Sequence, residues 1–387
     1  MTAAPRRDIL DMNAYRGHGD AGGLLARRMA NFGAASVLFY DQPLQIVSAR
    51  GSWMQAADGT RYLDCYNNVP SVGHCHPGVV AAVARQTAEL TVNSRYLHEG
   101  VETYIERLRA TVPGGPRNVV LCCSGSEAND LAMRVCMKAT GRRGFIVTEA
   151  AYHGNTLAVT DISPSSWRRG AAPAWVRLIP APSVDNYGPD IAAGFAAAAA
   201  RAAAALDAAG FGAAGFFCDS VFSSDGVHAD PPGFLAPAVE AVRAAGALYV
   251  ADEVQPGFGR TGAGMWGYLR HGVEPDVITL GKPMGNGFPM AGMILRPELL
   301  DRFCEDTGYF NTFGANPVAA AAGLAVLDAI RDEDLIAAAA RTGARLLAGL
   351  RALSDRGCVT RVRGAGLFIG VQMDGPARAA AMIDALR

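Results

Sequence analysis

The sequence predicts an α/β protein built on a mainly parallel sheet, and strand-like segments separated by helix-like ones carry that prediction. The segments 118–122 (NVVLC), 247–251 (ALYVA) and 276–280 (DVITL) are short apolar runs with β-branched side chains, and small or polar residues follow each of them. Runs that are apolar on both faces are typical of strands in a parallel sheet that helices cover. The alternation of strands with helices favours an α/β fold.

The elements before and after this sheet predict a second, smaller domain. Segment 45–63 (QIVSARGSWMQAADGTRYL) is strand-rich, and its Asp58-Gly59 pair is typical of a hairpin turn. Helices are expected at 316–331 and 333–353. These patterns divide the chain into an amino-terminal part of a small domain (1–63), a large domain (64–302) and a carboxyl-terminal part of the small domain (303–387).

Composition excludes several classes of function. A formal net charge of −1 and a pI near 6.7 offer no basic stripe, which argues against nucleic-acid binding. The alanine-rich segment 191–210 contains Arg201 and Asp207, so we expect a surface or partly buried helix and no membrane span. Residues 1–20 are polar and charged, without the apolar core of an export signal.

The eight cysteines show no spacing typical of a disulfide framework or a metal site. Cys75 lies between His74 and His76, but we expect a structural turn there and no bound metal. Free thiols favour a reducing compartment, and we expect a cytoplasmic protein.

Lys282 is the first candidate catalytic residue. Lys138 and Lys282 are the only lysines among 35 lysines and arginines, and arginine stays protonated and cannot act as an amine nucleophile. Lys282 follows the strand predicted at 276–280, and the carboxyl ends of strands are where ligands bind in open α/β sheets. We interpret Lys282 as a Schiff-base lysine; a solvated loop lysine is the alternative.

Asp252 ends the strand predicted at 247–251, at the same edge of the sheet as Lys282. A carboxylate next to a pyridine nitrogen keeps that nitrogen protonated, so the ring can withdraw electrons from a substrate carbon. A turn or helix-capping aspartate is the alternative. After the strand at 118–122, Ser124, Gly125 and Ser126 precede a helix, and a helix amino terminus with free N–H groups is an anion site.

These segments and their order resemble the class III, fold type I aminotransferases, which use pyridoxal 5′-phosphate (PLP). The similar segments are YNNVPSVGHCHPGVV, CSGSEAND, AYHGNT, ADEVQPGFGRTG, TLGKPMGNGFP, YFNTFGANPVAAAAGLAVLD and VRGAGLFIG. Within the class, GKPMGNG and FNTFGANP look most like the branch that holds alanine-glyoxylate aminotransferase 2-like proteins and the phosphoethanolamine and phosphohydroxylysine phospho-lyases. The resemblance implies a mainly parallel large domain and a smaller α+β domain from both chain ends.

The resemblance also implies roles for single residues. Lys282 would form the Schiff base with PLP and move the proton at the substrate α-carbon, and Asp252 would pair with the ring nitrogen. Tyr152 would stack on the ring, and His153 would line the same site. The remaining cofactor-binding residues implied are Gln255 at the phenolic oxygen, Ser124, Gly125 and Ser126 at the phosphate, and Thr312 at the phosphate of a neighbouring subunit. Thr312 therefore implies a homodimer with shared active sites.

The chain departs from the family in two places. Where many members carry a Glu-Pro-x-Gln-Gly-Glu-like stretch, this chain has CDSVFSSDG: Asp219 matches the first glutamate, while Phe222 and Ser224 replace the glutamine and the second glutamate. The second glutamate pairs with a switchable arginine in ω-aminotransferases, so we expect no such switch here. The family usually continues past VRGAGLFIG to an arginine that binds the substrate carboxylate, and Arg363 is not expected to replace it.

Three functions fit these residues. The family favours an aminotransferase that takes an amine or amino acid as a small-molecule donor. The altered loop and the branch favour a PLP-dependent lyase, or an elimination or replacement enzyme, on a phosphorylated or otherwise activated amino compound. A PLP-binding protein without catalysis is the third, against which Lys282, Asp252 and Tyr152 argue. Polar groups at Ser223, Ser224, Asp225 and Arg95 are candidates for binding a second anionic group, or are solvated loop residues.

Overall fold

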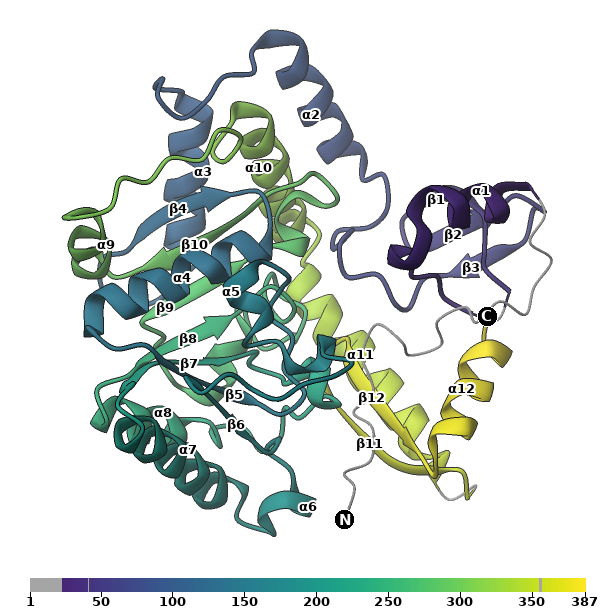
Figure 1. Cartoon of the computed structure of the whole chain (residues 1–387). Helices are drawn as coiled ribbons and strands as arrows, with labels where there is room; N and C mark the ends of the chain where they lie inside the picture. Colours follow the sequence, from purple (N-terminus) through teal and green to yellow (C-terminus); the bar gives the residue numbers. More distant parts are fainter. Residues whose placement is uncertain (1–22, 41, 355–356) are drawn as a thin grey trace.

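The computed structural model describes residues 23–40, 42–354 and 357–387, and Figure 1 shows their arrangement around one large sheet. The amino-terminal segment 1–20, where we expect no export signal, lies outside the described residues. Three sheets are formed in the described part of the chain: one of seven strands and two smaller antiparallel ones.

The seven-stranded sheet has the order β4-β10-β9-β8-β7-β5-β6. Its strands are β4 (Asn118–Cys122), β5 (Gly144–Thr148), β6 (Val176–Ile179), β7 (Ala213–Cys218), β8 (Leu248–Asp252), β9 (Val277–Leu280) and β10 (Ala291–Leu295). β10 runs antiparallel to both of its neighbours, and the pairs from β9 to β6 are parallel. The mainly parallel sheet is therefore confirmed, and the predicted strands match β4, β8 and β9 to within one residue.

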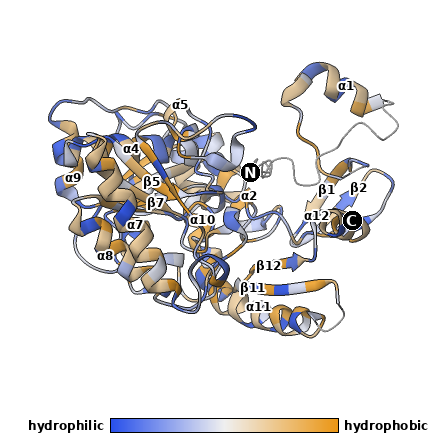
Figure 2. Ribbon diagram, turned by 60° about the horizontal axis from the view of Figure 1, so that its bottom comes forward, coloured by the Kyte–Doolittle hydropathy of each residue, from blue (hydrophilic) through white to orange (hydrophobic). Residues whose placement is uncertain are grey.

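Helices cover both faces of this sheet because its strands are apolar on both sides (Figure 2). α4 (Gly125–Thr140) packs on one face, where it buries Leu131 and Val135, and α9 (Pro297–Cys304) lies beside it. α7 (Ile191–Ala208) and α8 (Ala236–Ala244) pack on the other face. α7 is long and apolar enough to span a membrane, but it buries Phe195 and Leu206 in the core, as a core helix does.

Three longer helices surround the sheet edge near β4 and β10 (Figure 1). α10 (Pro317–Asp332) packs against α2 (Pro77–Glu89) and α3 (Glu99–Ala110). The short helical segments are η2 (Gly33–Ala35), α5 (Leu157–Thr160), η3 (Pro164–Ser166), α6 (Val184–Tyr187), η4 (Ser223–Asp225), η5 (Gly267–His271) and η6 (Lys282–Gly285).

The chain ends form the two smaller sheets. α1 (Gly23–Phe32) precedes the antiparallel strands β1 (Ile46–Arg50), β2 (Trp53–Ala56) and β3 (Arg61–Leu63). The turn between β2 and β3 contains the predicted Asp58-Gly59 pair, and Asp58 Oδ1 accepts from the Thr60 N–H at 2.9 Å. α11 (Leu335–Arg351) packs on the hairpin of β11 (Val359–Ala365) and β12 (Phe368–Met373), and α12 (Pro376–Ala385) follows.

The two chain ends contact each other at Arg387 and Gln42. Arg387 Nη1 donates to the carbonyl oxygen of Gln42 at 2.8 Å, and Figure 1 shows α12 beneath the amino-terminal sheet. The domain boundaries at 63 and 302 stay a prediction.

Candidate functional site

Lys282 is the first residue of η6, separated from β9 by Gly281, and protein surrounds most of its amine. Burial lowers the pKa of Lys282, while the negative charges of Asp252 and Asp219 raise it by a smaller amount. No hydrogen bond or ion pair to this amine is found among the described residues. A buried amine with a lowered pKa and no fixed partner is suited to nucleophilic and proton-transfer chemistry.

Asp252 is the last residue of β8, and β8 pairs with β9 in parallel, so Asp252 and Lys282 lie at the same edge of the sheet. Its carboxylate is buried and has three hydrogen-bond partners. Asp252 Oδ2 accepts from Asn129 Nδ2 at 2.9 Å and lies 2.7 Å from His153 Nδ1, and Oδ1 accepts from the Val254 N–H at 3.1 Å. These donors fix the orientation of the carboxylate.

Asn129 connects the carboxylate to the segment that carries His153. Its Nδ2 also donates to the His153 carbonyl oxygen at 2.7 Å, and the His153 N–H donates to Ser163 Oγ at 2.9 Å. Sequence reasoning missed Asn129 and Ser163. The available signal was an asparagine inside a helix pattern, where its amide competes with the backbone and is unfavourable unless it has a partner.

The amino terminus of α4 packs directly against the strand ends that carry Asp252 and Lys282. A Cβ added to Gly125 would lie 3.0 Å from Val254 Cγ2, and one added to Gly281 would lie 3.3 Å from Gly125 Cα. A side chain at either glycine would crowd these neighbours, so glycine favours this close approach. The predicted serine-glycine segment and the lysine are therefore neighbours, as the sequence predicts.

A capping box shapes this helix end. Ser124 Oγ accepts from the Glu127 N–H, and Glu127 Oε2 accepts from the N–H groups of Ser124 and Cys123. The N–H groups of Gly125 and Ser126 find no acceptor among the described residues. They are open donors at the positive end of the helix dipole, next to Lys282.

The loop after Tyr152 and His153 closes over the same helix end. Asn155 N–H donates to Ser126 Oγ at 3.2 Å. A Cβ added to Gly154 would lie 2.5 Å from Ser126 Oγ. Tyr152 is half-buried and His153 is buried, with its Nε2 lacking a hydrogen-bond partner among the described residues.

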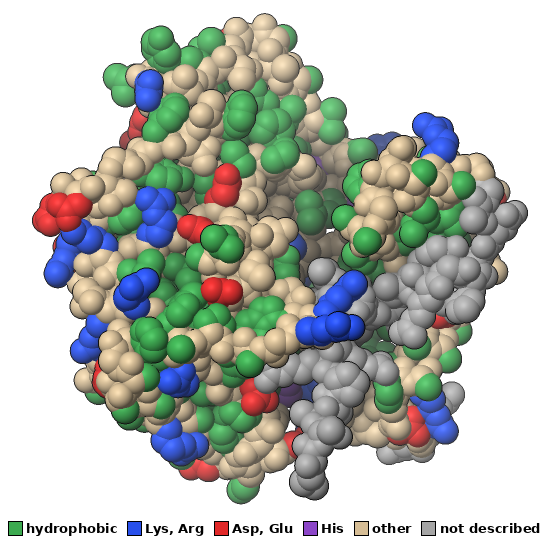
Figure 3. Space-filling model, in the orientation of Figure 1, with side chains coloured by type: hydrophobic (Ala, Val, Ile, Leu, Met, Phe, Trp, Pro, Cys, Tyr) green, Lys and Arg blue, Asp and Glu red, His purple; other side chains and the backbone are tan. Residues whose placement is uncertain are grey.

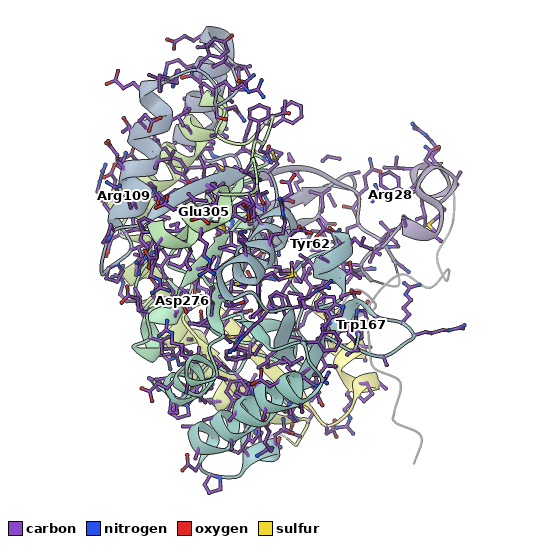
Figure 4. The ribbon with its side chains drawn as sticks, turned by 60° about the vertical axis from the view of Figure 1, so that its left-hand side comes forward. Arg28, Tyr62, Arg109, Trp167, Asp276 and Glu305 are labelled. Atoms are coloured by element: carbon purple, nitrogen blue, oxygen red, sulfur yellow. The ribbon has the colours of Figure 1, made fainter. Side chains whose placement is uncertain are left out.

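The last two predicted residues differ in their surroundings. Gln255 is half-buried, and its Oε1 accepts from Asn68 Nδ2, a contact that sequence reasoning missed. Thr312 is exposed in the segment between α9 and α10 and does not join the other predicted residues within the described chain. Asp276, labelled in Figure 4, lies just before β9 at the end of the strand opposite Lys282, and its carboxylate pairs with Arg243 and Arg296.

The altered loop at 219–226 uses its polar groups internally. Asp219 accepts from the N–H groups of Val221 and Ser223, and Ser223 Oγ also donates to Asp219. Asp225 accepts from Thr148 Oγ1 and from the Ala150 N–H. Ser223 and Asp225 are therefore engaged within the protein, which corrects the idea that they are open to bind a second anionic group.

The two arginines that the sequence raised also have partners. Arg363 donates to the carbonyl oxygens of Gly226 and Val227 and to Gln372 Oε1. It holds the loop, as expected for an arginine that does not replace the family's carboxylate-binding residue. The Arg95 guanidinium lies over the Phe310 ring, 4.2 Å from its centroid.

Comparison with known proteins identifies the family. A phospholyase from Arthrobacter, solved in complex with phosphoethanolamine, matches with 42% identity and a TM-score of 0.87 over 92% of this chain and 85% of that one. An alanine–glyoxylate aminotransferase 2-like protein of Drosophila melanogaster is 38% identical over 89% of this chain and 73% of its own length. An ethanolamine-phosphate phospho-lyase homologue of Caenorhabditis elegans is 35% identical over 90% of this chain and 79% of its own length. The model of the aminotransferase class-III family matches residues 39–387, so the chain belongs to this family of enzymes.

Proposed function

We propose that this protein is a PLP-dependent phospho-lyase that removes phosphate from a phosphorylated 2-amino alcohol, with phosphoethanolamine as the first substrate to test. The similarity to the Arthrobacter phospholyase in complex with phosphoethanolamine carries the proposal. The loop at 219–226 supports it, because Ser224 stands where ω-aminotransferases carry the glutamate that pairs with a switchable arginine. This choice develops the alternative that the sequence left open beside an aminotransferase.

The residues of the site fit PLP. Within the described part of the chain, the Gly125 and Ser126 N–H groups have no acceptor and suit its phosphate, and the Lys282 amine has no partner and suits its aldehyde. The oriented carboxylate of Asp252 suits its ring nitrogen. We assign Tyr152 and Gln255 to the ring face and the phenolic oxygen. When bound, PLP supplies an aldehyde that takes up the substrate amine and a ring that withdraws electrons from the neighbouring carbon.

The protein's own groups then perform three tasks. Lys282 Nζ accepts the proton from the substrate carbon that carries the amino group, and burial favours this role because it lowers the pKa of Lys282. Asp252 keeps its orientation through Asn129 and His153. Burial of these groups excludes water and strengthens their electrostatic interactions.

The net reaction balances with water as the co-reactant. The bond between the terminal carbon and the phosphate oxygen breaks, phosphate leaves with the electron pair, and hydrolysis of the resulting unsaturated amine yields acetaldehyde and ammonia. The test is to incubate the PLP-loaded protein with phosphoethanolamine and to measure phosphate, ammonia and acetaldehyde. The proposal requires equal amounts of the three; no phosphate release from phosphoethanolamine or longer phosphorylated 2-amino alcohols contradicts it.

An aminotransferase is the second candidate, and the 38% identity to the alanine–glyoxylate aminotransferase 2-like protein favours it. The same preparation with alanine and glyoxylate would then form pyruvate and glycine in equal amounts, without a released leaving group. A protein that catalyses this exchange and releases no phosphate is a transferase.

We also propose a homodimer in which Thr312 reaches the phosphate site of the partner subunit. Thr312 is exposed here, and Phe310 and Phe313 beside it are 43% and 71% exposed. Hydrophobic side chains also gather on the part of the surface that α2 and α10 occupy (Figure 3). Large exposed aromatic side chains next to a site are typical of an interface.

A further inference from the structure

Asp225, in the loop that departs from the family pattern, joins two segments that are distant in sequence. Its Oδ2 accepts from Thr148 Oγ1 at 2.7 Å, and its Oδ1 accepts from the Ala150 N–H at 3.1 Å. Thr148 is the buried last residue of β5, and Ala150 lies two residues before Tyr152. The carboxylate therefore holds the start of the segment that carries Tyr152 and His153.

The other end of that segment is held independently. The His153 N–H and carbonyl oxygen bond to Ser163 and Asn129, and its ring bonds to Asp252. Tyr152 thus lies between two fixed points: Ala150, which Asp225 holds, and His153. Loss of the first fixed point removes the Asp225 bonds to Thr148 and Ala150 and leaves the backbone before Tyr152 held by the Ser165 N–H, which donates to the Ala151 carbonyl oxygen at 3.1 Å, while His153 stays in place.

The loop that carries Asp225 is itself fixed from the far side by the β11–β12 hairpin. Arg363 donates to the Gly226 carbonyl oxygen through Nε at 3.2 Å and Nη2 at 2.9 Å. Gly370 of β12 also approaches closely, since an added Cβ would lie 2.9 Å from the same oxygen. The β11–β12 hairpin thus holds the loop that carries Asp225, and Asp225 holds the segment that carries Tyr152.

Desolvation of the Asp225 carboxyl group costs free energy at this position. Protein surrounds its carboxyl group closely enough that desolvation raises the pKa of Asp225 to about 7, even though part of the residue is exposed. Its hydrogen bonds come from Thr148 and Ala150, and no arginine or lysine forms an ion pair with it in the described part of the chain. A desolvated carboxylate without a cation destabilises a fold, which points to a functional reason for its presence.

We propose that Asp225 is a positioning residue that fixes Tyr152 for PLP by holding Thr148 and Ala150. This inference rests on the proposed binding of PLP at Lys282, but not on the reaction that follows. A wild-type protein that does not bind PLP overturns the proposed function, whereas the inference is judged by variants of a protein that does bind it.

The experiment is a fluorescence titration of PLP into the apo-protein, so its readout is cofactor affinity and not turnover. Asp225→Ala removes both hydrogen bonds and is expected to weaken PLP binding about tenfold. Asp225→Asn keeps an acceptor for the Ala150 N–H and a donor for Thr148, and is expected to stay within about twofold to threefold of the wild type. Thr148→Val removes one bond with little change of shape and is expected to weaken binding at least about threefold.

Two controls separate positioning from a general loss of stability. Asp230→Ala removes a carboxylate that lies four residues after this loop and pairs with Arg270, and it should leave PLP affinity unchanged. Val242→Ala truncates a buried side chain of α8 and lowers apo-protein stability without touching the segment.

The double variant Asp225→Ala/Thr148→Val should bind PLP as weakly as Asp225→Ala alone, because the two residues act through one contact.

Three outcomes overturn the inference. PLP affinity of Asp225→Ala within twofold of the wild type shows that the contact does not position the site. An equal loss in Val242→Ala shows a general stability effect. If Asp225→Ala does not fold, unchanged affinity in Thr148→Val overturns the inference by itself.

Discussion

At the scale of single residues, the sequence offers a matched pair of lysines. Lys282 is enclosed at the sheet edge, and Lys138 lies near the end of α4, where it pairs with Asp306. Lys282→Ala is expected to lower the turnover rate by a factor of about 10³ or more, because the protein loses both its nucleophile and the group that moves the proton. Lys138→Ala should keep full activity. Steady-state kinetics and the visible absorbance of the loaded protein check both variants.

Reduction of the PLP-loaded protein with borohydride provides a second check on the same residue. The reduced cofactor should be found by mass spectrometry on the peptide that contains Lys282 and not on the one that contains Lys138. A label on Lys138, or visible absorbance that persists unchanged in Lys282→Ala, contradicts the assignment.

Glu253, next to Asp252, predicts how stability depends on pH. It is fully buried, and burial raises its pKa to about 7 although Ser220 Oγ and the N–H groups of Gly267 and Tyr268 donate to it. Between pH 4.5 and 7 the folded protein therefore keeps a proton that the unfolded chain has released. The stability contributed by this proton is present below pH 4.5 and is lost as the pH rises towards 7.

The expected slope from Glu253 is up to about −1.4 kcal/mol per pH unit within that window. Glu253→Gln should remove this slope from the free energy of unfolding, measured by urea denaturation of the apo-protein between pH 5 and 8. The quantity to compare is the difference in slope between the wild type and Glu253→Gln. Burial also lowers the pKa of His271 to about 4, and that group adds a slope of opposite sign to both proteins. Parallel pH profiles for the two proteins would refute the prediction.

At the scale of elements, the strands and helices were predictable where their signals are local. β4 matches its predicted range in full, and β8 and β9 match theirs to within one residue, because a short apolar run ends at glycine, serine or aspartate. The meeting of Asp252 with Lys282 was predictable too, since parallel strands end at one edge. The hydrogen bonds made by Asn129, Asn68 and Asp225 were not predictable, because their partners lie far away in sequence and are brought close only by the folded backbone.

The helix amino terminus of α4 provides a prediction at this scale. Gly154→Ala would place a Cβ 2.5 Å from Ser126 Oγ and 2.8 Å from Ser126 Cα, at a φ of +140° that side chains disfavour. The contact should displace the open N–H groups at the helix end and weaken PLP binding by about tenfold or more, from strain of about 1–3 kcal/mol. Titration of PLP into the apo-variant measures the loss.

Gly141→Ala is the matched control, at the other end of the same helix. Its φ of +70° also disfavours a side chain, but nothing lies within 4 Å of the added Cβ. The substitution should lower stability by about 1 kcal/mol and leave PLP affinity unchanged. An equal loss of affinity in both variants would show that helix stability, and not the position of the helix end, controls binding.

At the scale of the whole molecule, the described chain brings most residues of the proposed PLP site together but leaves Thr312 outside them. Asp252, Lys282 and the amino terminus of α4 converge at one sheet edge, while Thr312 stays exposed beside Phe313. An exposed aromatic next to a residue that the family places at a neighbour's phosphate is explained by a second copy of the chain. In the proposed dimer, each active site is completed by Thr312 of the partner subunit.

Phe313→Glu tests this arrangement, because a charge on a 71% exposed aromatic changes little in the isolated chain but is costly when a partner buries it. Sedimentation velocity should show a dimer for the wild type and a larger monomer fraction for the variant, with PLP affinity falling as the monomer fraction rises. Val184→Glu adds the same charge at a partly exposed position on α6 and should leave the dimer intact. A monomeric wild-type protein that binds PLP fully and turns over would show that each chain completes its own site and that Thr312 has no role at a neighbour's phosphate.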